Sequence, residues 1–170
     1  KQDIRGFHRV YQVSYSPDGR SLVFSAQNRG QSDIYTYHLV NRTSTQINRD
    51  IFDDSHPTLV DIADTRGVIF SSNRPNEEIT NASYDTILPS RKSKLYFYDL
   101  KDSKAQISKL STDDFEESSI SQKLNDSEFV YLSNKNGISN LYKGELTPTL
   151  LRIDTLQDGE IIQLDSITGY

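Results

Sequence analysis

The chain has 170 residues, a net charge of −5 and 34% hydrophobic residues. This length suffices for one sizeable core, and the negative charge argues against a nucleic acid as the main partner. No apolar run approaches the length of a membrane span, so no direct membrane insertion is expected. Cysteine is absent, which excludes disulfides and thiolate metal sites. The many aromatic residues and the short bursts of Val, Ile and Leu favour an all-β chain.

Four short strands are predicted at the start of the chain, separated by polar turns. The first turn, at 16–19, reads Ser-Pro-Asp-Gly, in which Pro fixes one φ and Gly supplies a positive one. No segment shows a sustained 3.6-residue period, so very little helix is expected. This spacing is typical of an antiparallel meander. We place the strands at Val10–Ser16, Ser21–Ala26, Asp33–Leu39 and Ser44–Asn48.

The pattern of the second and third strands returns twice along the chain. An apolar run that ends in Ser is followed by a polar turn and by an apolar-Tyr pair. The run ends at Ser25, again 46 residues later at Ser71, and a third time at Ser133. The second interval is longer by about 16 residues because an insertion at 76–93 precedes KLYFYDL. Without the insertion, the period is close to the ~40–45 residues of a four-stranded propeller blade.

The first unit carries the most specific pattern: Ser-Pro-Asp-Gly, a strand ending in Phe-Ser, a polar turn and Asp-Ile-Tyr. This pattern resembles the WD40-like PD40 repeat, which is found in the TolB C-terminal propeller of bacterial envelopes and in tricorn-type protease propellers. The second unit keeps Phe70–Arg74, and the third keeps Leu141 and Tyr142. The resemblance implies a β-propeller and a periplasmic or cell-envelope location. It implies no activity, because propellers host many unrelated functions.

The resemblance predicts an all-β propeller segment of about three four-stranded antiparallel blades plus the start of a fourth. The expected units are 10–50, 51–113 and 114–154, followed by an incomplete unit at 155–170. Because propellers typically need four to eight blades to close, we expect the chain to belong to a larger propeller. Methionine is also absent, so Lys1 is not a native translation start, and we expect a processed protein or an excerpt.

Inner strands of a blade are covered on both faces, so their apolar residues run consecutively instead of alternating. This predicts which side chains form the core. We expect burial of Leu22, Val23, Phe24, Ile34, Val68, Ile69, Phe70, Leu95, Phe97, Phe129, Val130 and Leu141.

The sequence shows no convincing catalytic or metal motif. The single acidic residue of the turn at 16–19 is too few for a calcium loop. His8, His38 and His56 are the only imidazoles, and without a Gly-x-Ser-x-Gly elbow or an HExxH pattern we expect structural or surface roles for them. No Gly-rich phosphate loop occurs either. We therefore expect no enzymatic activity, no cofactor and no metal.

Acidic pairs lie where one unit meets the next. They form either a negative rim for a cation or basic partner or, as we favour, solubilising loop charge. These pairs are Asp53-Asp54, Asp113-Asp114 and Glu116-Glu117.

Tyrosines of the predicted strands form either a stacking platform for bases or sugars or, as we favour, part of the core between blades. They are Tyr11, Tyr15, Tyr35, Tyr37, Tyr96 and Tyr98.

The insertion at 76–93 is the most individual feature of the chain. A loop of this length without its own structure is usually functional or disordered. It interrupts a predicted hairpin, so it should protrude, and both partner contact and passive decoration are open for it. The candidate contact residues are Glu77, Glu78, Tyr84, Ile87, Leu88, Arg91 and Lys92.

These features favour a non-enzymatic protein-binding or scaffolding propeller domain of a larger, TolB-like cell-envelope protein. Its partner would be another protein, or other domains or blades of the same chain. One alternative is the accessory, substrate-gating propeller of a tricorn or prolyl-oligopeptidase-like peptidase. A Gly-x-Ser-x-Gly segment beyond Tyr170 would favour that alternative. The other alternative is a carbohydrate- or ion-binding propeller.

Overall fold

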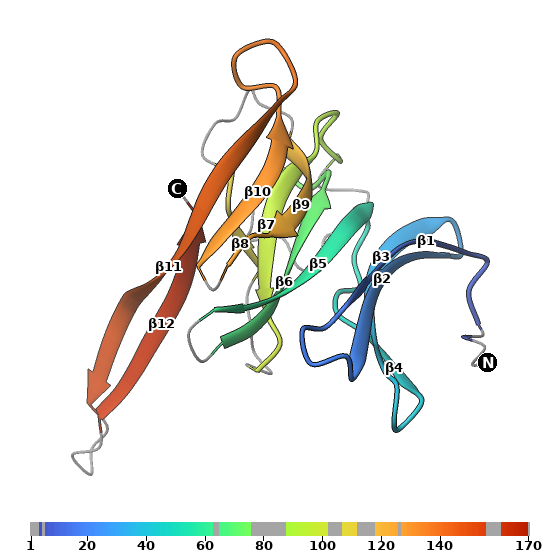
Figure 1. The fold of residues 1–170 in the computed structure, drawn as a ribbon, viewed down its shortest axis with the longest axis horizontal. Coiled ribbons are helices and arrows are strands. Elements are labelled where there is room, and N and C mark those ends of the chain that lie inside the picture. Colours follow the sequence, from blue (N-terminus) through green and yellow to red (C-terminus); the bar gives the residue numbers. More distant parts are fainter. Residues whose placement is uncertain are drawn as a thin grey trace.

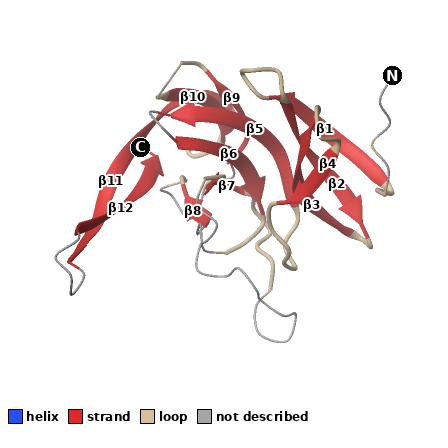
Figure 2. Ribbon diagram, turned by 90° about the horizontal axis from the view of Figure 1, so that it is seen from below, coloured by secondary structure: helices blue, strands red, loops and turns tan. Residues whose placement is uncertain are grey.

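The structure is a computed structural model that describes residues 4, 6–62, 65–75, 88–101, 107–111, 118–125, 127–155 and 161–169. These residues form strands and turns but no helix (Figures 1 and 2). Accordingly, this part of the chain offers no apolar helix long enough to cross a membrane. The strands build three four-stranded antiparallel sheets, which we call sheets 1, 2 and 3 in chain order.

Strands follow one another within each sheet in chain order. Sheet 1 consists of β1 (Arg9–Tyr15), β2 (Ser21–Asn28), β3 (Gln31–His38) and β4 (Thr43–Gln46). Sheet 2 consists of β5 (Asp54–Ile62), β6 (Thr65–Ser72), β7 (Lys94–Asp99) and β8 (Ile107–Lys109). Sheet 3 consists of β9 (Ser118–Lys123), β10 (Glu128–Ser133), β11 (Asn140–Thr155) and β12 (Ile161–Gly169). The four strands predicted for the first unit agree with β1 to β4 within two residues.

The sheets stack face to face in chain order, with sheet 2 in the middle (Figure 1). Their first strands lie against their neighbours: β5 contacts β1, and β9 contacts β5. This arrangement confirms the predicted all-β propeller segment built from consecutive antiparallel blades.

The core divides into layers because successive side chains of a strand point to opposite faces. On β6, Val68 and Phe70 pack against Val23 and Ile34 of sheet 1. Between them, Ile69 belongs to the layer shared with sheet 3. Covering both faces in this way explains the unbroken apolar run of β6. Ten of the twelve side chains expected in the core are buried, and Val130 and Leu141 are not.

A one-residue difference in strand register explains the exposure of Leu141. In sheet 2, Leu95 of β7 lies opposite Ser71 of β6. The repeat alignment places Leu141 opposite Ser133 in the same way, but in sheet 3 Leu141 lies opposite Leu132. A shift of one residue turns every side chain of a strand to the other face of the sheet.

The partial exposure of Val130 has a different cause, because this residue lies between Phe129 and Tyr131 on β10 and points to the outer face of sheet 3, which no other described sheet covers. Phe129 is buried against sheet 2, and Tyr131 packs beside it. Val130 is only half-buried, and Leu141 is 66% exposed. The prediction that these two residues are buried was therefore wrong.

The end of the chain also differs from the expected layout. Strand β12 pairs with β11 and completes sheet 3 instead of beginning a fourth sheet. The division into units at 10–50, 51–113, 114–154 and 155–170 stays a prediction. Strand β11 is long enough to pair with β10 along its first part and with β12 along its second. The β11–β12 hairpin consequently extends away from the stacked sheets (Figure 1).

Gly67 of β6 provides a direct test of this packing. A Cβ atom at Gly67 would collide with the Phe97 ring and lie 2.8 Å from the backbone oxygen of Tyr98. We expect Gly67→Ala to lower the free energy of unfolding by about 1–3 kcal/mol, because the ring and the backbone cannot both move aside in a filled layer. Chemical denaturation measures this loss. Val40→Ala, at a 73% exposed turn position, is the control and should change stability by no more than about 0.5 kcal/mol. A Gly67→Ala variant as stable as the native chain would contradict the packing.

Candidate functional site

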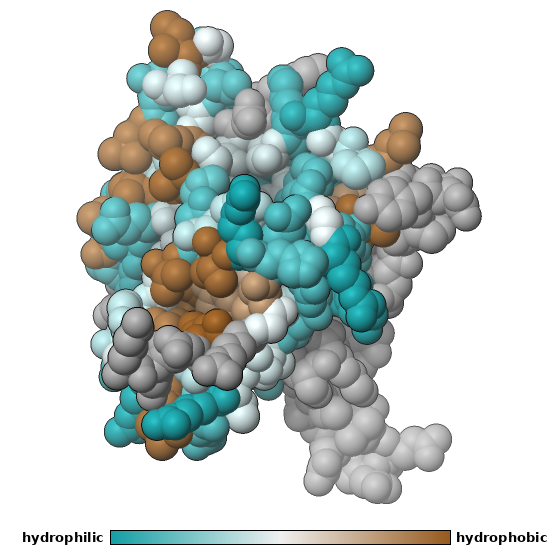
Figure 3. Space-filling model, turned by 90° about the vertical axis from the view of Figure 1, so that its right-hand side faces the viewer, coloured by the Kyte–Doolittle hydropathy of each residue, from teal (hydrophilic) through white to brown (hydrophobic). Residues whose placement is uncertain are grey.

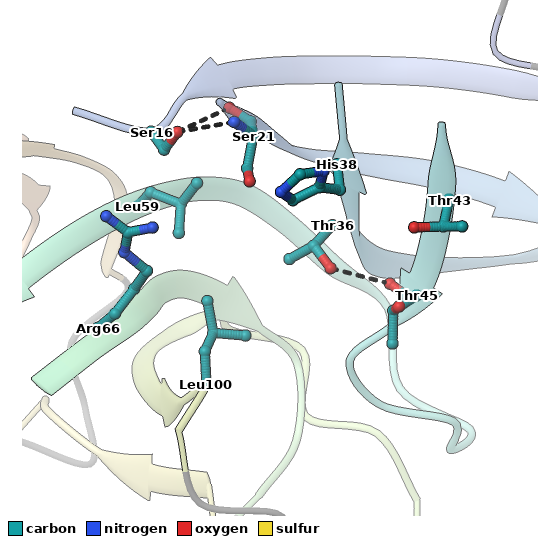
Figure 4. A pocket seen from close by; sticks show the side chains of 9 residues that line it. All are labelled: Ser16, Ser21, Thr36, His38, Thr43, Thr45, Leu59, Arg66 and Leu100. Atoms are coloured by element: carbon teal, nitrogen blue, oxygen red, sulfur yellow. Dashed lines mark hydrogen bonds between the residues drawn. The ribbon is translucent and has the colours of Figure 1, made fainter. Parts of the chain in front are cut away.

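A pocket of about 340 Å³ opens between sheets 1 and 2 (Figure 4). It lies at the end of the sheets where the turns between β1 and β2 and between β3 and β4 are found. Seven of its nine lining residues are polar or charged. The lining residues are Ser16, Ser21, Thr36, His38, Thr43 and Thr45 of sheet 1, and Leu59, Arg66 and Leu100 of sheet 2.

Cross-strand pairing puts the sheet 1 side chains of this pocket on one face. Thr36 lies opposite Thr45, and His38 lies opposite Thr43. The His38 imidazole accepts a hydrogen bond at Nδ1 from the backbone N–H of Asn41, at 3.2 Å. In the neutral ring, Nε2 therefore carries the proton and is a donor. Thr36 donates a long hydrogen bond of 3.5 Å to the Thr45 carbonyl.

Arg66 forms the charged wall of the pocket, and its charge is balanced. Its Nη1 lies 3.2 Å from Asp18 Oδ2, and its Nε lies 2.8 Å from Asp61 Oδ1. Asp18 also accepts hydrogen bonds from the Ser16 hydroxyl and from the Arg20 backbone N–H. The Ser16 bond and, next, the Arg20 bond are the main reasons that the pKa of Asp18 falls to about 2. The turn at 16–19 thus uses its carboxylate to hold the turn and to tie sheet 1 to sheet 2.

A buried ionic cluster lies deeper between the same sheets. Arg74, which follows β6, is fully buried, and its Nη2 contacts Asp50 at 3.0 Å and Asp54 at 3.1 Å. The rings of Phe52, Phe70 and Tyr96 surround the guanidinium at 5.4 to 5.7 Å from its carbon to the ring centres. Buried guanidinium and carboxylate groups are costly unless they are paired, so each partner depends on the other.

Asp33 on β3 adds a further carboxylate near this cluster. It is 5% exposed, and its Oδ2 accepts a hydrogen bond of 3.0 Å from Gln46. Burial, reinforced by the charges of Asp54, Asp50 and Asp53, raises the pKa of Asp33 from 3.8 to about 7. The pKa of Asp54 is also raised, chiefly by burial, against the opposing pull of the buried guanidinium. In the folded state, Asp33 and Asp54 therefore keep protons that the unfolded chain would release.

This predicts that the chain is more stable at pH 5 than at pH 8. Between about pH 4 and pH 7 the folded state keeps a proton on Asp33 that the unfolded state has lost, so the free energy of unfolding falls as the pH rises. We expect Asp33→Asn to remove on the order of 2 kcal/mol of this decline. Urea unfolding of both proteins at pH 5, 6, 7 and 8 measures it. Glu145→Gln, at an exposed position on β11 of sheet 3, serves as the control. Equal pH slopes for the native chain and Asp33→Asn would contradict the prediction.

The three histidines lie apart on different elements. His8 is exposed near the start of β1, and His38 lines the pocket. His56 sits at a bulge in β5, with Nδ1 at 3.0 Å from the Ser55 hydroxyl and Nε2 at 3.4 Å from the Gln12 amide. Burial lowers the pKa of His56. An amide instead of a carboxylate faces the second ring nitrogen, so this Ser-His contact lacks the acidic member of a catalytic triad.

The acidic pair at 53–54 is divided between two environments. Asp53 is exposed and accepts a hydrogen bond from the backbone N–H of Ser32. Asp54 is buried in the ionic cluster, so the expectation of solubilising loop charge is wrong for it. The pairs Asp113-Asp114 and Glu116-Glu117 lie outside the described residues. Within the described ranges, no group of three acidic, His or Cys side chains is arranged to hold a metal ion.

The tyrosines also divide into two groups. Tyr35, Tyr37 and Tyr96 are buried, as predicted for core residues. Tyr98 is half-buried and packs against the apolar layer between sheets 1 and 2. Tyr11 and Tyr15 on β1 are 43% and 67% exposed, so the core prediction was wrong for them. They lie at the edge of sheet 1, where the neighbouring sheet is missing on their side.

The insertion is described only at its end. Leu88, Arg91 and Lys92 are exposed, and Leu88 is 79% accessible. The other candidate contact residues, Glu77, Glu78, Tyr84 and Ile87, lie outside the described residues. The structure therefore leaves the role of the insertion as a prediction.

Neither the ionic cluster nor the pocket was predicted from the sequence. In the sequence, Arg74 was noted only as part of the repeat pattern. Its partners Asp50 and Asp54 precede it by 24 and 20 residues. The sequence held one indication of the cluster. Arg74 lies two residues after the apolar strand β6 and directly before Pro75, and it is not part of a run of charged residues.

Comparison with known proteins identifies the family. The N-terminal region of dipeptidyl peptidase IV (DPP IV) is a protein family whose pattern matches residues 5–165. The chain belongs to the DPP IV N-terminal region family. This family membership and the stacked sheets agree on a β-propeller, whereas the narrower PD40 assignment stays a prediction.

Among solved structures, the chain is similar to the crystal structure of TolB from Acinetobacter baumannii. The TM-score is 0.44 at 19% sequence identity, over 96% of this chain and 41% of the TolB chain. This chain thus spans less than half the length of that protein. No curated protein matches the sequence.

Proposed function

We propose that the chain is a non-enzymatic, PD40-type propeller segment that binds protein through its outer sheet faces. The bound protein is a separate partner, or other domains or blades of the same polypeptide. The observation that supports this proposal is the exposure of apolar side chains on the faces of sheets 1 and 3 that point away from sheet 2. Exposed apolar patches of this kind mark interaction sites.

On sheet 3 the outer face carries Val130, Leu132 and Leu141. Leu132 and Leu141 are directly opposite each other, and Leu141 is 66% exposed. Between sheets 1 and 2, by contrast, the facing apolar side chains are buried in a packed layer. A further protein surface on this face would bury these side chains in the same way.

On sheet 1 the outer face is only partly covered. Phe7 packs on the rings of Phe24 and Tyr35, with ring centres at 5.3 and 4.6 Å. Val13 and Tyr15 lie opposite β2 on the same face and stay 52% and 67% exposed. Figure 3, which views the molecule from the side of sheet 1, shows hydrophobic surface between hydrophilic regions.

Affinity purification of the tagged protein from its own cells tests the proposal. We expect Leu141→Asp and Tyr15→Asp to lose a protein that co-purifies with the native chain, because a carboxylate cannot be buried unpaired in an apolar contact. Val40→Asp, at a 73% exposed site in the turn between β3 and β4, is the matched control. Unchanged capture by both outer-face variants would sink the proposal.

Absence of catalysis is part of the same proposal. It is supported by the separation of the three imidazoles and by the amide that replaces the acidic partner of His56. The purified chain should be inert against ester, peptide, phosphate and glycoside substrates. Turnover that is lost on replacing His8, His38 or His56 would overturn this part. The periplasmic or envelope location rests on the repeat resemblance and is tested by cell fractionation.

Membership of the DPP IV N-terminal region family favours one second candidate, the accessory propeller of a peptidase. In that case a serine hydrolase domain would share the polypeptide. Labelling of the full-length protein with a fluorophosphonate probe distinguishes the two. A labelled polypeptide supports the peptidase alternative, and an unlabelled one supports the non-enzymatic scaffold.

A further inference from the structure

We propose that the pocket between sheets 1 and 2 binds a small neutral carbohydrate of monosaccharide size. This site is separate from the outer faces that carry the proposed protein binding. It is formed by hydroxyl groups of sheet 1 on one side and by Arg66, Leu59 and Leu100 of sheet 2 on the other (Figure 4). Its volume of about 340 Å³ is at the small end of the range of ligand pockets.

The hydrogen-bonding groups of the pocket suit a ligand that both donates and accepts. Thr43 and Thr45 alternate along β4 on the pocket side, and each hydroxyl can act in either role. His38 adds a directed donor, because its Nδ1 is occupied by the Asn41 backbone N–H. Sugar hydroxyls have the same dual character, so several of them can be satisfied at once.

The electrostatics of the pocket argue against a charged ligand. An anion approaching Arg66 would meet a guanidinium that already contacts Asp18 and Asp61. A cation would find those two carboxylates turned toward Arg66 and the Ser16 hydroxyl instead of the pocket. A neutral ligand avoids both conflicts.

The apolar part of the lining supports the same ligand class. Leu59 is 4% exposed and lies in the pocket wall beside Leu100. A pyranose ring has C–H faces that pack on such side chains while its hydroxyls point to polar groups. The pocket therefore offers both kinds of surface that a monosaccharide needs.

NMR titration of the isotope-labelled chain tests this proposal. The probes are D-glucose, D-galactose and N-acetyl-D-glucosamine, with sodium acetate as an anionic comparator and triglycine as a peptide comparator. We expect at least one sugar to saturate amide shifts at 36–45, Leu59, Arg66 and Leu100, with a dissociation constant on the order of millimolar for so small a ligand. Tighter binding of acetate or triglycine than of every sugar would overturn the proposal, as would no saturable response to any of the three sugars.

Paired variants on β4 provide the control. Thr43→Val with Thr45→Val keeps the side-chain shape and removes two hydroxyls from the pocket, so sugar affinity should fall at least about fivefold. Ser44→Val changes the residue between them, which lies on the other face of the strand, and should bind as the native chain does. Since either variant could disturb folding, His38→Asn gives a second test: Asn keeps an acceptor for the Asn41 N–H and lacks the Nε2 donor. Undiminished binding by both pocket variants would refute the site.

Discussion

Replacing Arg74 by Met should lower the free energy of unfolding by about 3–5 kcal/mol. The substitution keeps an apolar side chain between Phe52, Phe70 and Tyr96 but leaves Asp50 and Asp54 buried without a cation. Urea unfolding at pH 8 measures the loss. Because the stranded carboxylates can take up protons, the loss should shrink as the pH is lowered to 5.

A charge-free variant separates the lost ion pair from lost packing. Combining Arg74→Met with Asp50→Asn and Asp54→Asn removes all three charges, and most of the stability should return. Buried ion networks replaced as a whole by neutral groups are often no less stable than the original. An Arg74→Met protein within 1 kcal/mol of the native chain at pH 8 would show that the cluster does not hold sheets 1 and 2 together.

Phe70→Ala should also cost about 3–5 kcal/mol. Phe70 is fully buried in β6, between sheets 1 and 2, and its ring lies 6.1 Å from that of Tyr96 and 5.7 Å from the guanidinium carbon of Arg74. Truncation removes apolar contact and opens a cavity that two rigid sheets cannot close. Val40→Ala, at a 73% exposed turn position, should change stability by no more than about 0.5 kcal/mol. A loss below 1 kcal/mol for Phe70→Ala would mean that the two sheets are not packed as the structure shows.

The stacked sheets could be predicted because their signals are local. The consecutive apolar residues Val68, Ile69 and Phe70 require cover on both faces, whatever the partner sheet is. The turn at 16–19 fixes the first hairpin through its own Pro and Gly. Both signals lie within a few residues of the structure that they determine.

The exposure of Leu141 could not be predicted in the same way. Its face depends on whether it pairs with Ser133 or with Leu132, and the sequence motif is compatible with both registers. In the structure, Leu141 pairs with Leu132, and β11 continues beyond β10 to pair with β12. The repeat pattern alone therefore does not predict the register of this hairpin.

The sites between sheets depend on distant residues. Arg74 meets Asp50 and Asp54 only after β5 and β6 have paired. Likewise, Arg66 and His38 face one pocket only because sheets 1 and 2 are stacked. Residue types and spacing along the chain do not show which distant residues will be in contact. The sequence therefore predicted structural or surface roles for the histidines and solubilising loop charge for the acidic pairs.

Site-specific photo-cross-linking tests the central claim, that the outer sheet faces bind protein, most directly. A photoreactive phenylalanine analogue at Leu141 or Tyr15, introduced in the native host cells, should form a covalent adduct with a specific protein or with another segment of the same polypeptide. The analogue at Val40, which is more exposed than either but lies in the turn between β3 and β4, should form none. Mass spectrometry identifies the cross-linked residue on the partner. Adducts at Val40 equal to those at Leu141 and Tyr15, or none at Leu141 and Tyr15, would contradict the claim.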